Sequence, residues 1–216
     1  ETLPATSAAH AAARGQAPAL VQDDESLSYA ALDALMDRVA AALQRDGVKP
    51  GEAIAICAAT SLSYAALFLG ALRAGAAAAP IAPSSTPASI AGMVADCGAR
   101  LFFLDAETEA ALAPARDQIK ASLIALDEGA HGPRFSAWLA PEGTVQSHFM
   151  RLGHIRRAAA MGYGPGKVTL LSTPLYSNTT LVSFLPTLGL GGCAVLIRKF
   201  DPGCYLALAQ RLHVTH

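Results

Sequence analysis

The clearest pattern along the chain is a stretch from Tyr29 to Asp46 in which large apolar residues recur every three or four positions. Polar residues such as Asp33 and Asp37 fall on the opposite side, so the stretch predicts an amphipathic helix with one buried face. Gly47 follows and ends the pattern. The apolar residues of the predicted face are Leu32, Leu35, Met36, Val39 and Leu43.

Short apolar runs alternate with helical segments through most of the chain. Such runs are typical of strands that are buried on both faces of a parallel sheet. We therefore predict an α/β fold of mostly parallel sheets with helices on both faces. The predicted strands are 19–22 and 26–28, which form a hairpin, then 53–58, 77–81, 101–104, 122–126, 168–172 and 193–197. The predicted helices are 7–14, 29–46, a helix from 61 or 63 to 74, then 87–97, 106–120, 146–161, 181–190 and 202–212; 127–143 is interpreted as a loop with an apolar patch at 135–140, and a further strand is expected at 213–216.

Charge is sparse and balanced. The 216 residues include 16 lysines and arginines against 17 aspartates and glutamates, a net charge of −1 that argues against a broad basic surface for nucleic acid or anionic lipid. Two uncharged runs, 53–72 and 168–197, reach the length of a membrane span. The first holds Thr60 near its centre and the second holds Pro186, so we interpret both as buried segments rather than membrane spans.

The cysteines and histidines do not predict a metal site. The four cysteines form no CxxC pair, and His148 and His154 are six positions apart, which places them on different faces of a helix. The cysteines at 57, 97 and 193 lie in small or apolar sequence, which predicts reduced, buried thiols. Because the first residues also lack the pattern of a signal peptide, we predict a cytoplasmic protein without metal ligands of its own.

Two glycine- or hydroxyl-rich segments are candidates for chemistry. The segment from Gly162 to Lys167 superficially resembles a phosphate-binding loop, but its glycine spacing is wrong and Val168 stands where a magnesium-binding hydroxyl is needed, so we predict a turn from helix to strand. The segment from Pro174 to Thr180 follows a predicted strand and precedes a predicted helix. Its hydroxyl and amide side chains could line a neutral polar pocket at the carboxyl end of a parallel sheet, or simply cap the helix; the spacing alone leaves both open.

Four stretches, in this order, resemble the adenylate-forming superfamily, which comprises acyl- and aryl-CoA synthetases, luciferases and the adenylation domains of peptide synthetases. Residues 27–32 (LSYAAL) resemble its early L-[ST]-Y-x-x-L signature, and 72–83 (LRAGAAAAPIAP) resemble L-[KR]-A-G-x-x-x-x-P-[LI]-x-P. Residues 174–176 (PLY) resemble the P-[LM]-[YF] segment at the acyl pocket, and 191–202 match the glycine pair, strand and K-F-D-P that follow it. The resemblance implies that the chain is part of the large N-terminal domain of such an enzyme.

The sequence departs from the family at its phosphate-binding loop, [ST]-S-G-[ST]-T-G-x-P-K-G. Gly143 and His148 fit the end of that motif, but everything before Gly143 is lacking, together with the strand that precedes it in the family. We therefore expect an interrupted N-terminal domain, with the phosphate-loop segment missing between about 142 and 143, and without the family's small C-terminal domain and its catalytic lysine. We favour a loop that belongs to the protein but is lacking from this sequence, because an internal deletion that spared both flanks would expose a raw sheet edge; a truly truncated chain remains the alternative.

The resemblance implies an acid–thiol ligase that uses ATP, Mg²⁺ and coenzyme A and acts on a small carboxylic acid through an acyl-adenylate. Its substrate-binding candidates are Tyr176, Ser177, Asn178 and Thr179, Gly143 and His148 are a remnant of the nucleotide loop, and no catalytic residue can be assigned. Amino-acid-activating relatives place an acidic residue near the pocket loop, so the uncharged run at 168–197 favours a neutral fatty or aromatic acid. Ser177 stands where many CoA ligases have His.

The rival hypothesis is a non-catalytic α/β module, a dimerising or regulatory remnant unable to bind ATP. Formation of a homodimer and the choice between coenzyme A and a carrier protein as thiol acceptor are both left open by the sequence. A nicotinamide dehydrogenase is disfavoured because its glycine-rich fingerprint is lacking.

Overall fold

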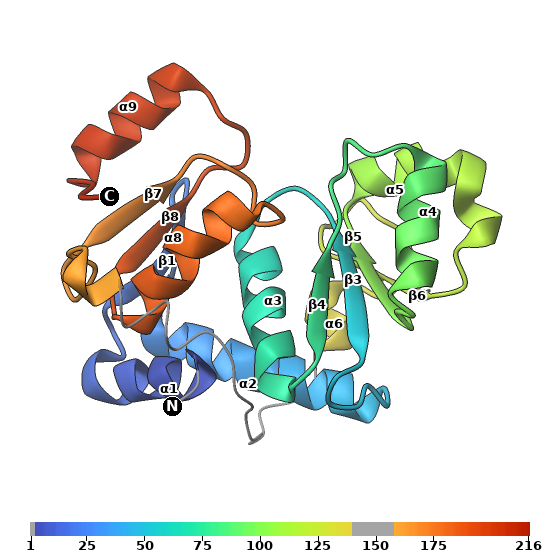
Figure 1. The fold of residues 1–216 in the computed structure, drawn as a ribbon, viewed down its shortest axis with the longest axis horizontal. Helices are drawn as coiled ribbons and strands as arrows, with labels where there is room; N and C mark the ends of the chain where they lie inside the picture. The colour runs from blue at the N-terminus through green and yellow to red at the C-terminus, as the bar shows by residue number, and fades with distance from the viewer. Residues whose placement is uncertain (1–2, 140–157) are drawn as a thin grey trace. The chain divides into compact units, whose positions relative to one another are not determined.

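The computed structural model describes residues 3–139 and 158–216, except for the side chains of 3–5 and 178. Within these residues the strands form two four-stranded sheets, sheet A in the order β2-β1-β8-β7 and sheet B in the order β4-β3-β5-β6 (Figure 1). Sheet A belongs to one compact unit (1–35, 60–65 and 147–216) and sheet B to a second (36–59 and 66–146). In the described residues no helix is long and apolar enough to cross a membrane.

Sheet A is parallel except for its first hairpin. β1 (Pro18–Gln22) pairs antiparallel with β2 (Glu25–Ser28), and the turn between them places Asp23 at a positive φ. β1 is parallel to β8 (Cys193–Leu196), which is parallel to β7 (Val168–Leu171). Residues 214–216 run along the other side of β7, where the amide of Leu170 donates to the carbonyl of His216 at 3.1 Å. This segment lies where the sequence predicted a further strand, but its residues are hydrogen-bonded to β7 without forming a regular strand.

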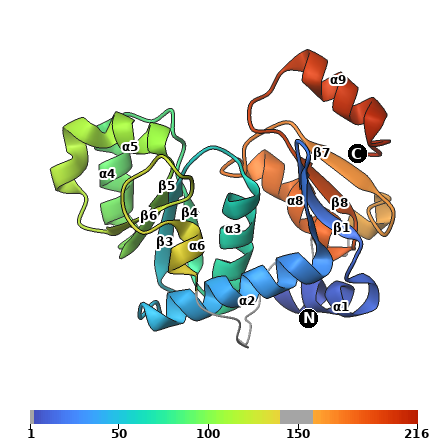
Figure 2. The ribbon, with the colours of Figure 1, turned by 180° about the vertical axis from the view of Figure 1, so that it is seen from behind.

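Two helices cover the opposite faces of sheet A (Figure 2). On one face Leu170 and Val195 pack with Leu208 of α9 (Pro202–Arg211). Because alternate residues of a strand point to opposite faces, Thr169 lies on the other face, where its hydroxyl accepts a 2.7 Å hydrogen bond from Thr187 of α8 (Asn178–Gly189). α1 (Leu3–Arg14) contacts α8 in the same unit.

Tyr29, the first residue of α2 (Tyr29–Arg45), is buried in the sheet-A unit. Its hydroxyl lies 2.6 Å from the carbonyl oxygen of Gly192 and 3.3 Å from that of Leu188, and it donates to this pair. The guanidinium of Arg14 stacks 5.1 Å from the centre of the Tyr29 ring. Burial raises the pKa of the Tyr29 phenol, although the charge of Arg14 opposes the rise.

Sheet B is entirely parallel. β3 (Ala53–Cys57) lies between β4 (Ala77–Pro80) and β5 (Leu101–Leu104), and β5 pairs with β6 (Ser122–Ala125). On one face Ala55, Phe102 and Leu104 form a core with α4 (Pro87–Asp96), α5 (Ala106–Leu112) and the following 3₁₀ turn (Ala113–Gln118). On the other face Phe103 packs edge-to-face with Trp138 of α6 (Phe135–Trp138), and the centres of the two rings are 4.9 Å apart.

Most element boundaries agree with the sequence predictions, and one exception is α1, which begins at Leu3 rather than at residue 7. The helix predicted over 106–120 becomes α5 and then a 3₁₀ turn, because Pro114 lacks the amide that an α-helix needs there. The segment interpreted as loop contains the short helix α6, whose Phe135 and Trp138 are buried. α8 begins at Asn178 rather than at Leu181, with Ser177 at its N-cap position. Most of the helix predicted over 146–161 lies outside the described residues.

Two contacts in the sheet-B unit depend on particular side chains. Gly70, in α3 (Leu62–Ala74), passes so close to α2 that an added Cβ would lie 2.5 Å from the Val39 side chain. Asp46 accepts hydrogen bonds from Arg45 at 2.8 Å and from the Trp138 indole at 2.6 Å. Partial burial by itself would raise the pKa of Asp46, but these donors outweigh it and hold the pKa below its usual value.

The cysteines are free, and they differ in exposure. Cys57 is buried, as predicted, and burial raises the pKa of its thiol to about 12. Cys97 and Cys193 are only partly buried, and burial raises the pKa of Cys193 to about 11. Cys204, on α9, is exposed. The expectation of buried thiols therefore holds fully for Cys57 and only in part for the other two.

Candidate functional site

The candidate site lies at the carboxyl edge of sheet A. β1, β8 and β7 are mutually parallel and end at Gln22, Leu196 and Leu171, so their carboxyl ends share one edge. In parallel α/β sheets this edge is where ligands bind. The segment 172–177 leaves β7 at this edge and leads into α8, which is where the sequence placed the pocket loop.

The loop between β7 and α8 is held to its own helix by one buried residue. Thr180 is 2% exposed, and its hydroxyl lies 2.9 Å from the carbonyl oxygen of Thr173 and 2.7 Å from that of Pro174. The amide of Ser177 closes a turn by donating to Pro174 at 2.9 Å. These bonds fix the loop at both of its ends, so the side chains between them are presented from a defined backbone.

The predicted substrate-binding residues stand together at this point. Tyr176 and Ser177 are half-buried, and Ser177 occupies the N-cap position without using its side chain to cap the helix. Asn178 and Thr179 form the start of α8, where Thr179 is exposed. Ser177 thus stands at the N-cap, but its hydroxyl makes no capping hydrogen bond. Gly143 and His148, the predicted remnant of the nucleotide loop, lie outside the described residues.

Two buried polar residues, neither of which the sequence indicated as a site residue, connect this loop to the rest of its unit. Gln22 is 5% exposed; its amide nitrogen donates to the carbonyl of Thr60 at 3.0 Å, and its oxygen accepts from the amide of Leu62 at 3.2 Å. Thr60 is 4% exposed, and its hydroxyl accepts from the amide of Leu175 at 3.3 Å. The only sequence signal was their position, each immediately after an apolar run.

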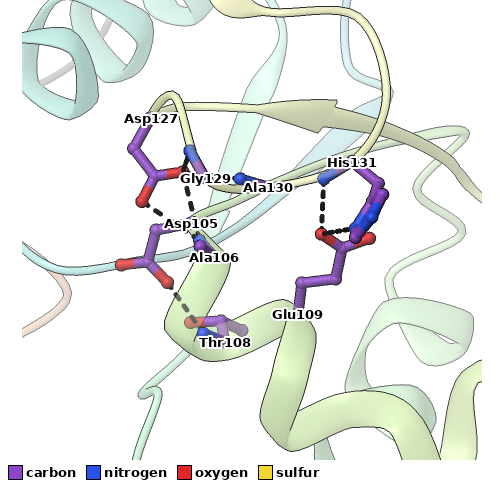
Figure 3. Close-up of polar contacts among 8 residues, drawn as sticks. All are labelled: Asp105, Ala106, Thr108, Glu109, Asp127, Gly129, Ala130 and His131. Atoms are coloured by element: carbon purple, nitrogen blue, oxygen red, sulfur yellow. Dashed lines mark hydrogen bonds and ion pairs between the residues drawn. The ribbon is translucent and has the colours of Figure 1, made fainter.

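A second cluster of polar residues, at the carboxyl edge of sheet B, serves the backbone instead (Figure 3). Asp105 accepts hydrogen bonds from the amides of Ala59 at 2.7 Å and Thr108 at 2.9 Å. Asp127 accepts from the amides of residues 106, 129 and 130, and Glu109 accepts from the amide and ring of His131. The carboxylates are thus engaged in capping helices and turns. Within the described residues no group of three or more His, Cys, Asp or Glu side chains could hold a metal ion.

The segment from Gly162 to Lys167 is a turn that leads into β7, as predicted. Residues 158–160 are helical, Gly162 and Gly166 have positive φ values, and the strand begins at Val168. The turn therefore lies at the amino end of β7, opposite the edge at which ligands bind in such sheets.

This architecture is that of the N-terminal domain of adenylate-forming enzymes. The fold matches a long-chain-fatty-acid CoA ligase of Archaeoglobus fulgidus with a TM-score of 0.89 and 14% identity, over 100% of this chain and 50% of that one. It matches a benzoate CoA ligase of Burkholderia xenovorans with a TM-score of 0.83 and 20% identity, over 96% of this chain and 47% of that one. At these identities the likeness establishes the fold.

The sequence itself establishes the family. The family model for AMP-binding enzymes matches residues 7–144. The chain belongs to this family of AMP-binding, adenylate-forming enzymes. Among its relatives is a protein described as a nonribosomal peptide synthetase, CymA of Salinispora arenicola, which is 27% identical over 198 residues, 87% of this chain and 2% of that protein. The chain thus spans half or less of the three proteins named here.

Proposed function

We propose that this chain is part of an ATP-dependent acid–thiol ligase that activates a neutral fatty or aromatic acid and transfers it to coenzyme A. In the first step a carboxylate oxygen attacks the α-phosphorus of ATP, pyrophosphate leaves, and an acyl-adenylate forms. In the second step the sulfur of coenzyme A attacks the acyl carbon and AMP leaves. Mg²⁺ enters with the phosphates of ATP, and no step is assigned to a metal held by described side chains.

The observation that carries the choice of substrate is the neutral character of the loop at the carboxyl edge of sheet A. Tyr176, Ser177 and Thr179 offer rings and hydroxyls, and residues 168–197 contain no charged side chain. A substrate ammonium group would need a carboxylate partner, because a buried unpaired charge is costly. Gly143 and His148, which fit the end of the family's phosphate-loop motif, are proposed to belong to the segment that binds the ATP phosphates.

The test is carboxylate-dependent exchange of pyrophosphate into ATP, measured on the protein as it occurs in its source. The panel contains a medium-chain fatty acid, a benzoate, a dicarboxylate and several amino acids. We expect exchange with the uncharged-chain or aromatic acids, and formation of the CoA thioester once coenzyme A is added. Exchange with an amino acid alone would refute the proposed substrate class.

A second candidate is an adenylation domain of a peptide synthetase, which the relationship to CymA favours. It differs in substrate and in acceptor, because a carrier protein presents its thiol on a phosphopantetheine arm. Transfer of the activated acid to a carrier protein, with no thioester formed on free coenzyme A, would establish this alternative.

The third candidate is a truncated, non-catalytic module, and it depends on the interruption between about 142 and 143. We propose that the natural protein contains the phosphate-loop segment and a C-terminal domain. Its intact mass should then be about twice the 22.2 kDa of this sequence or more, since the chain covers 50% of a structurally similar ligase. A natural mass near 22.2 kDa, without exchange activity, would instead identify the non-catalytic module.

A further inference from the structure

We propose that Thr60 and Gln22 are positioning residues that fix the position of the loop between β7 and α8 (172–177), an inference that rests on the proposed function of this loop in binding the acid. The Thr60 hydroxyl holds the amide of Leu175, the residue before Tyr176. Thr60 is in turn held by Gln22, at the end of β1. Three segments far apart in the sequence are thereby joined at one edge of sheet A.

The bond to Leu175 differs in kind from the other bonds of the loop. Thr180 and the turn from Pro174 to Ser177 tie the loop to its own helix and would move with it. The Thr60 hydroxyl ties it to a different element, because Thr60 precedes α3. It therefore connects the loop, through Thr60 and Gln22, to the end of β1, which is separated from β7 by β8.

Burial makes this bond consequential. Thr60 is 4% exposed and Leu175 is 1% exposed, so water has little access to the Leu175 amide if the hydroxyl is removed. A buried donor left without a partner is costly, and the loop would shift to satisfy it. Such a shift would displace the attached Tyr176 and Ser177, and a displacement of about 1 Å is enough to impair substrate positioning.

Gln22 gives the hydroxyl its own fixed place. Its two amide atoms bond the carbonyl of Thr60 and the amide of Leu62, one of the otherwise unpaired amides in the first turn of α3. An amide side chain is suited to this role because it offers a donor and an acceptor at once. Both residues are buried and bonded to backbone groups, so their proposed effect on the substrate is exerted through the loop.

The decisive variant is Thr60→Val, which keeps the shape of the side chain and removes the hydroxyl. In the natural protein we expect a rise of about 5- to 50-fold in the KM for the carboxylic acid, the range that corresponds to one buried hydrogen bond. The KM for ATP should be unchanged. Thr60→Ser keeps the hydroxyl and should restore the KM for the acid to within about 2-fold of wild type.

The matched control is Thr187→Val, which also removes a buried threonine hydroxyl from this unit, but one bonded to Thr169 and to Ser183. It should lower thermal stability while leaving the KM for the acid unchanged. If Thr60→Val does not fold, Gln22→Met provides a second disruption of the same connection, with the same expected split between the two KM values.

Amide hydrogen exchange separates the possible failures. In Thr60→Val the exchange of the Leu175 amide should accelerate, with or without substrate. Faster exchange with an unchanged KM for the acid would overturn the positioning role and leave the proposed function standing. If wild-type protein activates no acid at all, the proposed function itself fails and this inference falls with it. Equal changes in the KM for ATP and for the acid would indicate a general structural effect and would also overturn it.

Discussion

The hydroxyl of Tyr29 offers the most direct test of the packing in the sheet-A unit. Tyr29→Phe removes only this hydroxyl, because phenylalanine keeps the ring on which Arg14 stacks. The hydroxyl donates to the close pair of carbonyls at Leu188 and Gly192. Leu188 keeps a second donor, the amide of Gly191 at 3.0 Å, so the loss falls mainly on Gly192.

The expected cost is that of one buried hydrogen bond whose acceptor is left unsatisfied, about 1–3 kcal/mol. For a chain of this length that corresponds to a fall in melting temperature of about 2–12 °C. Circular dichroism during thermal and urea unfolding measures both quantities. Tyr205→Phe is the control, because the Tyr205 ring is only partly buried and packs beside Phe200; it should change stability by less than about 0.5 kcal/mol.

The pH dependence of the same pair of proteins gives an independent check. Because burial raises the pKa of Tyr29 in the folded protein, its stabilising effect is fully present below the unfolded value of 10.0. Above that pH the unfolded tyrosine ionises while the folded one does not, so the advantage over Tyr29→Phe should shrink. A variant whose stability equals wild type at neutral pH, or a gap that widens in alkali, would refute the reasoning.

Three further outcomes follow from the structure. Burial raises the pKa of the Cys57 thiol, whereas Cys204 is exposed. A thiol reagent at about pH 8 should therefore modify Cys204 quickly and leave Cys57 unmodified in the native protein. Peptide mass spectrometry measures both rates, and equal rates would contradict the burial of Cys57. Hydrogen bonds lower the pKa of Asp46, although burial opposes this effect. Wild type should therefore be more stable than Asp46→Asn at neutral pH, and it should lose that advantage as the pH falls below 3.8 toward the folded pKa. Urea unfolding at several pH values measures this difference in stability. Gly70→Ala places a methyl group against Val39 and should destabilise the protein by about 1–3 kcal/mol in the same assay, whereas Gly92→Ala, at an open position, should not.

Local signals predicted the elements well because each depended on a few neighbouring residues. Thr86 and Asp201 cap α4 and α9 from the position immediately before a proline, and each accepts a hydrogen bond from the amide three residues later. The apolar face of α2 could be predicted because residues such as Leu32 and Met36 recur at helical spacing. Both residues are fully buried in the structure. Pro114 breaks the helix in the structure. The sequence prediction missed this break because it gave more weight to the helix-forming residues on either side of the proline.

The order of the strands, and the hydrogen bonds that connect the candidate site to distant residues, could not be predicted in the same way. Pairing of Leu20 with Ala194 is a contact between distant parts of the chain, and no pattern near either residue indicates it. Gln22 and Thr60 looked like ordinary polar residues at the ends of apolar runs, and their role is defined only by partners that the fold brings to them. The neutral loop at 174–180 was recognised because its composition and its place after a strand are both local.

The strand order of sheet A also has a consequence for synthesis on the ribosome. Sheet B is built from consecutive strands between Ala53 and Ala125, so it can form as soon as that stretch has emerged. Sheet A joins Leu20 to Ala194, so the inner edge of its first hairpin stays unpaired until residue 194 has been synthesised. During that interval the open edge of β1 is exposed to other nascent chains. Chaperone dependence and aggregation during expression should therefore originate in β1 rather than in the strands of sheet B.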